Sequence, residues 1–174
     1  MAHLWLADGP QWSATPLEGD AFLLGTRGPE PLAAGSGSPA LLRSGAVGDD
    51  SWLVLTADID LRVNGTPALL GISALSDRDE IRVPGRAPVF FSTERLACVV
   101  PYPGGDGLAR CPRCKQPMEV GTPAVRCPAA ACRIYHHEDP AKGRPCWTYA
   151  PECALCPQPT ALDAGYRWMP GDWA

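Results

Sequence analysis

Apolar and polar residues alternate with a period of two in several short runs of the first 100 residues, and this period is typical of half-buried β-strands. Residues 2–6 (AHLWL) place Leu4 and Leu6 on one face, and residues 51–56 (SWLVLT) form a short apolar run between polar neighbours. Both runs predict strands. The same reasoning predicts further strands at residues 21–24, 41–42, 58–63, 79–83, 89–91 and 96–100.

A hairpin is predicted where Asn64-Gly65 follows the alternating run 58–63. Both residue types tolerate the positive φ angles of a two-residue hairpin turn, so this dipeptide between apolar runs is a strong short-range signal. Residues 68–70 are expected to form the return strand.

Turn-forming residues are abundant, because the 174 residues include 18 Gly and 20 Pro. This composition favours short strands and turns over long helices. We therefore predict a mainly β protein whose residues 1–104 form an antiparallel β-sandwich. Residues 25–40 are rich in Gly, Pro, Ser and Ala and are expected to form a loop. Residues 101–107 (PYPGGDG) are expected to link the sandwich to a second domain at 108–174.

The second domain is dominated by cysteine and histidine. Seven of the eight cysteines and two of the three histidines lie between Cys111 and Cys156. Two C-x2-C pairs flank a middle group of three Cys and two His, and thiolates at this spacing grip structural zinc. Seven Cys and one His close two four-ligand sites. Because a closed site cannot activate water, the pattern predicts two structural zinc ions.

Two other interpretations of the cysteines are open at this point: a disulfide framework, and one zinc ion with spare buried thiols. Residues 1–25 do not read as a secretory signal peptide, because Asp8 and Glu18 interrupt the apolar positions. We therefore expect a cytoplasmic protein and favour metal binding over disulfides.

Spacing alone also leaves two ways to pair the ligands, since either neighbouring or alternate Cys pairs can share a metal ion. Cys98 lies apart from the others and is expected to be a buried apolar residue.

The ligand order, with the segments CPRC, VRCPAAAC, YHHE and CW, resembles the prokaryotic RING finger family over residues 108–158, with kinship to the C4HC3 variants. The resemblance implies a treble-clef module in which two zinc ions form a cross-brace. It implies one site made of Cys111, Cys114, His137 and Cys146, and another made of Cys127, Cys132, Cys153 and Cys156.

Two spacings depart from the family pattern. Eight residues separate His137 from Cys146, where the family has two. His136 and Asp139 form an alternative third pair that keeps the shorter spacing and leaves Cys146 free. We favour the set with all seven thiols, because soft thiolates suit zinc. The segment 127–132 is also two residues longer than a standard C-x2-C pair, and we interpret its three alanines as a short loop.

A second resemblance concerns residues 61–83 (LRVNGTPALLGISALSDRDEIRV), which are similar to the latter half of a forkhead-associated (FHA) domain. It implies an FHA-like sandwich. The phosphothreonine pocket of that family uses a Gly-Arg turn and a Ser-x2-His motif. The chain has no Ser-x2-His and only Thr26-Arg27 at a comparable turn, so we expect no phosphopeptide binding. Arg27, Arg43 and Ser44 are interpreted as scattered surface residues rather than an anion site.

Charge and hydropathy argue against two classes of partner. The net charge is −4, with −6 over residues 1–106 and +2 over residues 107–174, so binding to nucleic-acid phosphates is not expected. No run of 18 apolar residues exists, so no membrane span is expected.

The C-terminal tail after Cys156 holds four large residues, Tyr166, Trp168, Met169 and Trp173. We expect this tail to fold back on the protein or to dock a partner.

The RING resemblance implies an adaptor that binds an E2-like ubiquitin-conjugating enzyme. As an E3 ligase it would promote transfer of a ubiquitin-like protein in a bacterial pathway without a covalent intermediate. The matching E2-binding surface comprises Pro112, Arg113, Trp147, Leu155 and Pro157. Trp147 is interpreted either as a contact or as a core residue between the sites. Members of the family often have an arginine after the last zinc ligand that bridges the E2 and ubiquitin, and this chain has Pro157-Gln158 there. The alternative function is a zinc-stabilised protein-binding module without ligase activity.

Overall fold

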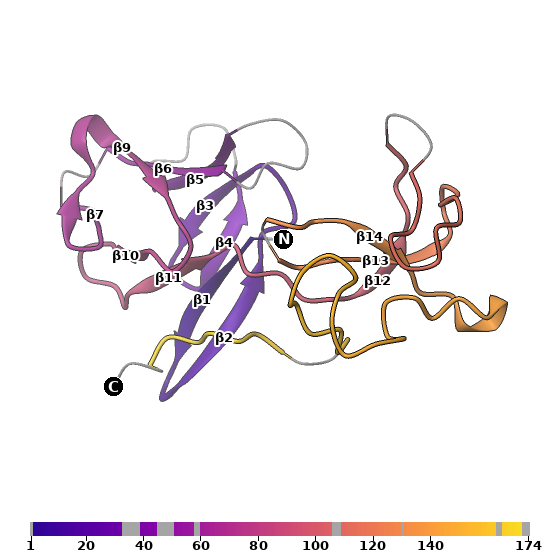
Figure 1. Cartoon of the computed structure of the whole chain (residues 1–174). Coiled ribbons are helices and arrows are strands. Elements are labelled where there is room, and N and C mark those ends of the chain that lie inside the picture. Colours follow the sequence, from indigo (N-terminus) through magenta and orange to yellow (C-terminus); the bar gives the residue numbers. More distant parts are fainter. Residues whose placement is uncertain are drawn as a thin grey trace. The chain divides into compact units, whose positions relative to one another are not determined.

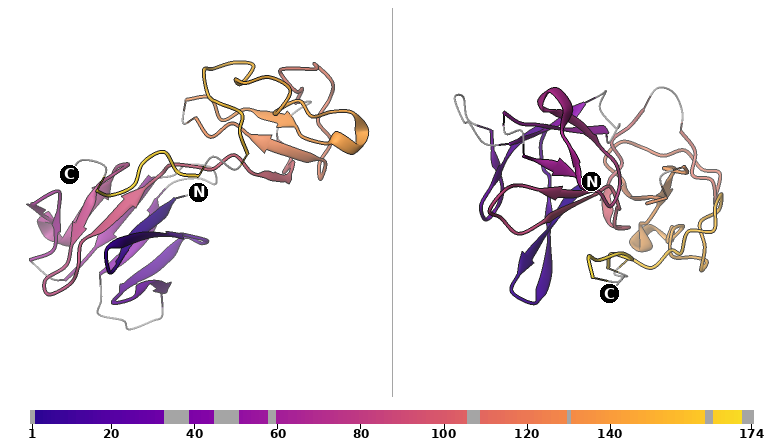
Figure 2. Two further views of the ribbon diagram at one scale, coloured as in Figure 1. Left: turned by 90° about the horizontal axis from the view of Figure 1, so that it is seen from below. Right: turned by 90° about the vertical axis from the view of Figure 1, so that its left-hand side faces the viewer.

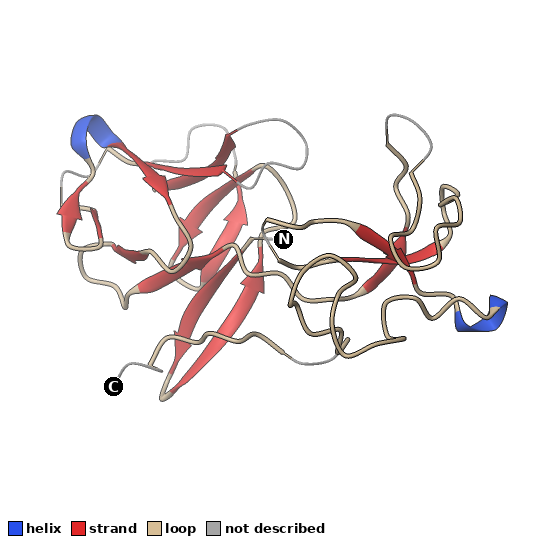
Figure 3. Cartoon of the chain, viewed as in Figure 1, coloured by secondary structure: helices blue, strands red, loops and turns tan. Residues whose placement is uncertain are grey.

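A computed structural model describes residues 2–32, 39–44, 51–57, 60–105, 109–129, 131–162 and 165–171, and it divides into two compact units. The first unit is Met1–Glu94 with Trp168–Ala174, and the second is Arg95–Arg167. Both are built from antiparallel strands (Figure 1). Within the described ranges, the only helical segments are two single 3-10 turns, η1 (Leu69–Gly71) and η2 (Pro140–Lys142) (Figure 3). No helix of this part is long and apolar enough to cross a membrane.

Two sheets make up the first unit. The six-stranded sheet has the order β2-β1-β11-β10-β7-β8 and the five-stranded sheet has the order β4-β3-β5-β6-β9. The strands of the first sheet are β1 (His3–Asp8), β2 (Gln11–Pro16), β7 (Arg62–Val63), β8 (Thr66–Pro67), β10 (Glu80–Arg82) and β11 (Val89–Ser92). The strands of the second sheet are β3 (Ala21–Gly25), β4 (Gly28–Pro31), β5 (Ala40–Ser44), β6 (Ser51–Leu55) and β9 (Ile72–Leu75).

The inner faces of these two sheets share one hydrophobic core, so the first unit is a β-sandwich. Leu4 of β1 and Phe91 of β11 are fully buried in it, together with Leu41 of β5 and Val54 of β6. The Trp52 ring of β6 lies 6.2 Å from the Phe91 ring, between centroids, which joins the two sheets directly. Burying the apolar positions of the alternating pattern is the main source of stability for such a fold.

The predicted Asn64-Gly65 turn is confirmed, with φ angles of 50° and 77° between β7 and β8. The Asn64 side chain also holds the turn against β10, because its Oδ1 accepts a 2.9 Å hydrogen bond from the Glu80 N–H. The prediction of a return strand at 68–70 is wrong. The strand ends at Thr66–Pro67, because Leu70 and Gly71 take positive φ angles and form the 3-10 turn η1.

Several predicted strands differ in their bounds. The strands β2 and β4 were not predicted, and β4 forms inside the segment 25–40 that was expected to be a loop. The predicted run 96–100 becomes β12 (Val99–Pro101), which pairs with β13 of the second unit and not with the sandwich. The units therefore divide before Arg95 rather than at the expected linker 101–107. The start of the run predicted at 58–63 lies outside the described residues.

The tail folds back on the sandwich, which confirms the first of the two expectations for it (Figure 2). Trp168 packs edge-on against Trp5 at 6.4 Å and against Phe90 at 5.9 Å, on the face of the six-stranded sheet opposite the core. Its N–H donates a 3.3 Å hydrogen bond to the Glu94 carboxylate. Trp168 is thereby buried and forms part of the first unit.

The described residues of the second unit form one three-stranded sheet, in the order β12-β13-β14, and the turn η2, and the rest of them lie in loops. Its other strands are β13 (Pro123–Arg126) and β14 (Tyr135–His137). Val125 of β13 pairs with His136 of β14, and Ala124 pairs with His137. Because successive residues of a strand face opposite sides, Ala124 and Val125 belong to two separate small cores.

Candidate metal centre

The structure gathers the eight predicted ligand residues into two groups of four. The first metal group is Cys111, Cys114, His137 and Cys146, and the second metal group is Cys127, Cys132, Cys153 and Cys156. Within each group the ligand atoms all lie within 4.8 Å of one another. Alternate pairs along the chain therefore share a group, and of the two pairings that spacing allowed, the structure has the interleaved one.

Both C-x2-C pairs sit at the tips of narrow hairpins. In the first, the Lys115 N–H donates a 2.9 Å hydrogen bond to the Cys111 carbonyl, and Lys115 has a φ of 63°. A bridge between Arg110 and Pro117 closes the base of this hairpin, and a bridge between Glu152 and Pro159 closes the other. The tight turns bring each pair of thiols to the same side of its hairpin, as a shared metal requires.

The sulfur separations fit a metal ion better than disulfides. Cys127 Sγ lies 3.6 Å from Cys156 Sγ, and Cys132 Sγ lies 3.9 Å from Cys153 Sγ. A tetrahedral site with Zn–S bonds of about 2.3 Å places sulfurs about 3.8 Å apart, whereas a disulfide bond is about 2 Å long. All eight cysteines are free, so the disulfide interpretation is wrong. Cys98 is exposed, so the expectation that it is a buried residue is also wrong.

His137 is held with one ring nitrogen toward the thiols. Its Nδ1 lies 3.3 Å from Cys114 Sγ, and its Nε2 lies 3.1 Å from the Pro117 carbonyl oxygen. A proton on Nε2 donates to that carbonyl and leaves the Nδ1 lone pair free for a metal. Metal-binding histidines are commonly oriented through the second nitrogen in this way. The first metal group can therefore present three sulfurs and one nitrogen, and the second can present four sulfurs.

These donor sets are compatible with zinc, which prefers four thiolate and imidazole ligands in closed structural sites. Family models, curated proteins and solved structures give no match to this chain.

The alternative third pair of His136 and Asp139 is not brought together by the structure. The His136 ring is buried on the opposite face of β14, where its Nε2 lies 3.8 Å from Cys153 Sγ of the second metal group. The Asp139 carboxylate lies 3.7 Å from Lys142 Nζ and belongs to neither group. Strand alternation explains the outcome, because His136 and His137 must point to opposite faces. Cys146 fills the position that Asp139 would have taken.

A buried carboxylate organises the long spacing between His137 and Cys146. Glu138 Oε2 accepts hydrogen bonds from the N–H groups of Trp147, at 3.0 Å, and Thr148, at 3.1 Å. Its Oε1 accepts a 2.7 Å bond from the Thr148 hydroxyl. Between these points the chain makes the turn η2, so the extra residues form a closed loop that returns Cys146 to the first metal group.

Burial shifts the pKa values of several ligands toward their neutral forms. Burial raises the pKa of the Cys146 thiol to about 12, and it also raises the pKa of Cys127. Burial lowers the pKa of His137. Neighbouring thiols add to the effect on both cysteines, since like charges oppose ionisation. A bound divalent cation supplies the opposite charge that thiolates require.

The predicted partner surface is only partly exposed. Trp147 has no exposed surface and packs edge-on against His136 at 5.2 Å, so it is a core residue and not a surface contact. Leu155 and Pro157 are exposed, whereas Pro112 and Arg113 are half-buried. Sequence reasoning did not single out Tyr149, which is 76% exposed and whose ring centroid lies 5.9 Å from the Arg113 guanidinium carbon. Its only sequence signal is its position two residues after Trp147.

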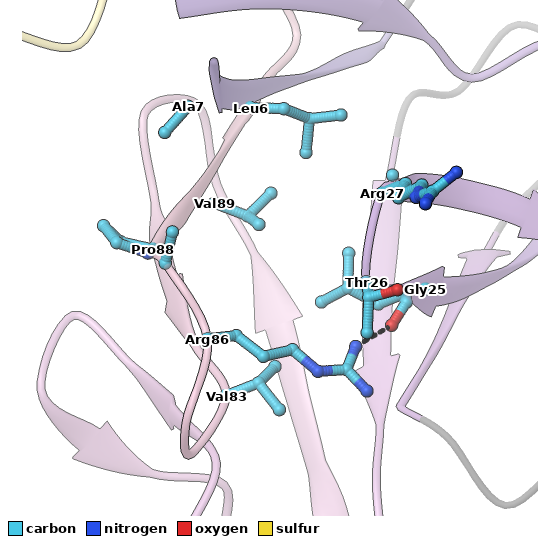
Figure 4. A pocket seen from close by; sticks show the side chains of 12 residues that line it. Leu6, Ala7, Gly25, Thr26, Arg27, Val83, Arg86, Pro88 and Val89 are labelled. Atoms are coloured by element: carbon cyan, nitrogen blue, oxygen red, sulfur yellow. Dashed lines mark hydrogen bonds between the residues drawn. The ribbon is translucent and has the colours of Figure 1, made fainter. Parts of the chain in front are cut away.

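The residues considered for an anion site in the first unit are not gathered together. Arg27 and Thr26 line a small cleft of about 90 Å³ (Figure 4). Arg86 also lines it, but this guanidinium donates a 2.6 Å hydrogen bond across the cleft to the Leu24 carbonyl oxygen. Arg43 lies elsewhere, 3.4 Å from the Asp20 carboxylate. Of the two arginines considered for an anion site, Arg27 and Arg43, only Arg27 lines this cleft.

Proposed function

We propose that residues 95–167 form a two-zinc module of the RING type, which binds an E2-like conjugating enzyme and promotes transfer of a ubiquitin-like protein. The observation that carries the proposal is the interleaving of the two metal groups. Sequential pairing would produce two independent knuckles, whereas interleaving ties four distant segments into one body. With all four positions filled by protein ligands, each zinc ion would serve as scaffold only.

In this function the chain binds and orients, and it forms no covalent bond with the transferred group. The amine nitrogen of the substrate attacks the thioester carbonyl carbon, a C–N bond forms as the C–S bond breaks, and the E2 cysteine leaves as a thiol. All of these atoms belong to the partners. The contribution of this chain is a rigid platform that restricts the thioester to reactive poses. Arg113 stiffens that platform, because it bonds to backbone carbonyls of two other segments.

The proposed contact surface consists of exposed apolar residues beside one cation. Leu155 is 62% exposed at the tip of its hairpin, and Pro157 follows it. Tyr149 adds an exposed aromatic ring close to Arg113. A contact surface of only a few residues is typical of a transient complex. We therefore expect a micromolar dissociation constant, which corresponds to a binding free energy of roughly −8 kcal/mol.

Two observations favour a second candidate function, a zinc-stabilised protein-binding module without ligase activity. The RING resemblance places an aromatic partner contact at Trp147, and that ring is fully buried. The bridging arginine expected after the last ligand is replaced by Pro157-Gln158. A module with these features can still bind a partner through Leu155 and Tyr149.

A binding and discharge experiment separates the two functions. The purified chain is mixed with an E2-like enzyme charged with its ubiquitin-like protein, and both complex formation and thioester discharge to free lysine are measured. We expect binding and faster discharge, and we expect Leu155→Arg to weaken binding at least tenfold while keeping its metal. Val120→Arg is the matched control, because Val120 is also exposed, at 74%, but lies outside the proposed surface. Binding without faster discharge favours the second function, and no binding contradicts the ligase proposal.

A further inference from the structure

Consecutive residues of the second unit divide between the two metal groups. In β14, His137 points into the first metal group, and the preceding His136 lies against the second. After the long loop, Cys146 is a ligand of the first group, and the following Trp147 packs in the core that contains Cys153. Short stretches of backbone therefore contact both groups at once.

His136 is the most direct of these links. Its ring has no exposed surface, and its Nε2 lies 3.8 Å from Cys153 Sγ, a ligand of the second metal group. That distance suits an N–H···S hydrogen bond. A buried imidazole directed at a ligand sulfur is a typical outer partner of a metal site, where it orients the ligand.

Arg113 supplies a second link between the groups. It lies between Cys111 and Cys114 in the first metal group, and its Nε donates a 2.7 Å hydrogen bond to the carbonyl of Cys146. Its Nη2 donates a 2.6 Å bond to the carbonyl of Glu152, the residue before Cys153. One side chain thus fixes the backbone at ligands of both groups.

We propose that His136 is a positioning residue that couples the two metal sites, so that loading one site favours loading the other. The inference rests on the proposed two-zinc loading. Metal binding through His137 orders β14, and ordered β14 holds His136 against Cys153. The site formed second then requires less ordering of the chain than the first. Coupling of this kind is reciprocal, so it does not depend on which site fills first.

The distribution of metal among molecules measures the coupling. The full chain is freed of metal and titrated with Zn²⁺, and native mass spectrometry counts the species with zero, one and two ions. At half loading, independent equal sites leave about half of the molecules with one ion, whereas a hundredfold coupling leaves about a tenth. We expect the wild type to show the smaller fraction. In His136→Phe, the one-ion species should rise above half, because the coupling is lost and one site loses affinity tenfold to hundredfold.

Val125→Ala is the matched control for lost packing. Val125 is buried on the same face as His136 and is its cross-strand partner, but it makes neither link. This variant should keep the wild-type distribution. His136→Gln tests the hydrogen bond itself, because the amide retains an N–H donor. It should recover the wild-type distribution at least in part, even if His136→Phe binds no metal at all.

The outcomes separate this inference from the function on which it rests. A wild type that never holds more than one zinc ion contradicts the two-zinc proposal itself. Two ions with the distribution of independent sites overturn the coupling alone. A His136→Phe protein with the wild-type distribution, or a His136→Gln protein that recovers nothing, overturns the role of His136. With Co²⁺ in place of zinc, a changed sulfur-to-cobalt charge-transfer band in His136→Phe supports direct contact with the second site.

Discussion

Arg113 Nε donates a 2.7 Å hydrogen bond to the carbonyl oxygen of Cys146, across 33 residues of sequence. The bond ties the first C-x2-C hairpin to the last ligand of the same metal group. The third ligand pair can therefore tolerate its long spacing, because Cys146 is positioned by contacts at its backbone as well as by a metal. A longer loop between ligands costs little once its ends are fixed.

The first prediction concerns metal content. The wild type should carry two zinc ions per chain, because the two groups present eight donors. Cys146→Ser should reduce the content to about one ion, and Asp139→Ala should leave it at two. Elemental analysis of gently purified protein measures the ratio. Loss of zinc from Asp139→Ala with retention in Cys146→Ser would reverse the ligand assignment.

Removal of metal should affect the two units differently. Among its described residues the second unit has two small hydrophobic cores, so we expect metal binding to supply much of its folding free energy, whereas the sandwich has a larger core of its own. A strong chelator should therefore unfold residues 95–167 and spare residues 1–94. Hydrogen exchange resolved by segment distinguishes them. Equal loss of protection in both units would mean that they fold as one domain.

Glu138→Ala should destabilise the second unit by about 2 kcal/mol, because the N–H groups of Trp147 and Thr148 and the Thr148 hydroxyl lose a charged acceptor. Urea unfolding of the zinc-loaded protein measures the change. Glu119→Ala, at an exposed carboxylate, should change stability by less than about 0.5 kcal/mol. Equal effects would contradict a structural role for Glu138.

Two substitutions in the turn η1 should change the stability of the first unit in opposite directions. Leu70 is fully exposed with a φ of 55°, so Leu70→Asn should stabilise the first unit by up to about 1 kcal/mol, since Asn tolerates this conformation better. Gly71→Ala should destabilise it, because φ is 76° and a Cβ would collide with the Thr56 carbonyl oxygen. Thermal unfolding followed by near-ultraviolet circular dichroism reports both. A destabilised Leu70→Asn would show that the leucine makes a contact in solution.

Trp168→Ala should destabilise the first unit rather than the second. The ring is buried against Trp5 and Phe90, and an Arg78 guanidinium lies 5.6 Å from its centroid. Loss of a buried tryptophan costs about 3 kcal/mol. Met169→Ala, at a neighbouring residue that is partly exposed, should cost much less. If zinc affinity fell in Trp168→Ala while the unfolding of the sandwich did not change, the tail would belong to the second unit.

The sequence by itself determined the features that local chemistry dictates. The Asn64-Gly65 turn follows from residues that tolerate positive φ, and the inward positions of Ile81 and Val83 follow from alternation. The seven clustered cysteines and the two candidate histidines follow from their chemical type and from the two C-x2-C spacings. Such features are visible in a single sequence, because they depend on residue type and on neighbours only a few residues away.

Only the tertiary structure decided which histidine faces which group, and which strands belong together. Either His136 or His137 satisfies the spacing, and the pairing of β14 with β13 fixes which face each ring takes. Trp147 fits a surface contact equally well in sequence, but its packing in one core with Val125 and Cys153 leaves it no access to solvent. The physical reason is that facing and burial depend on which segments pack together, and the free energy of packing is set by contacts between residues that are distant in sequence.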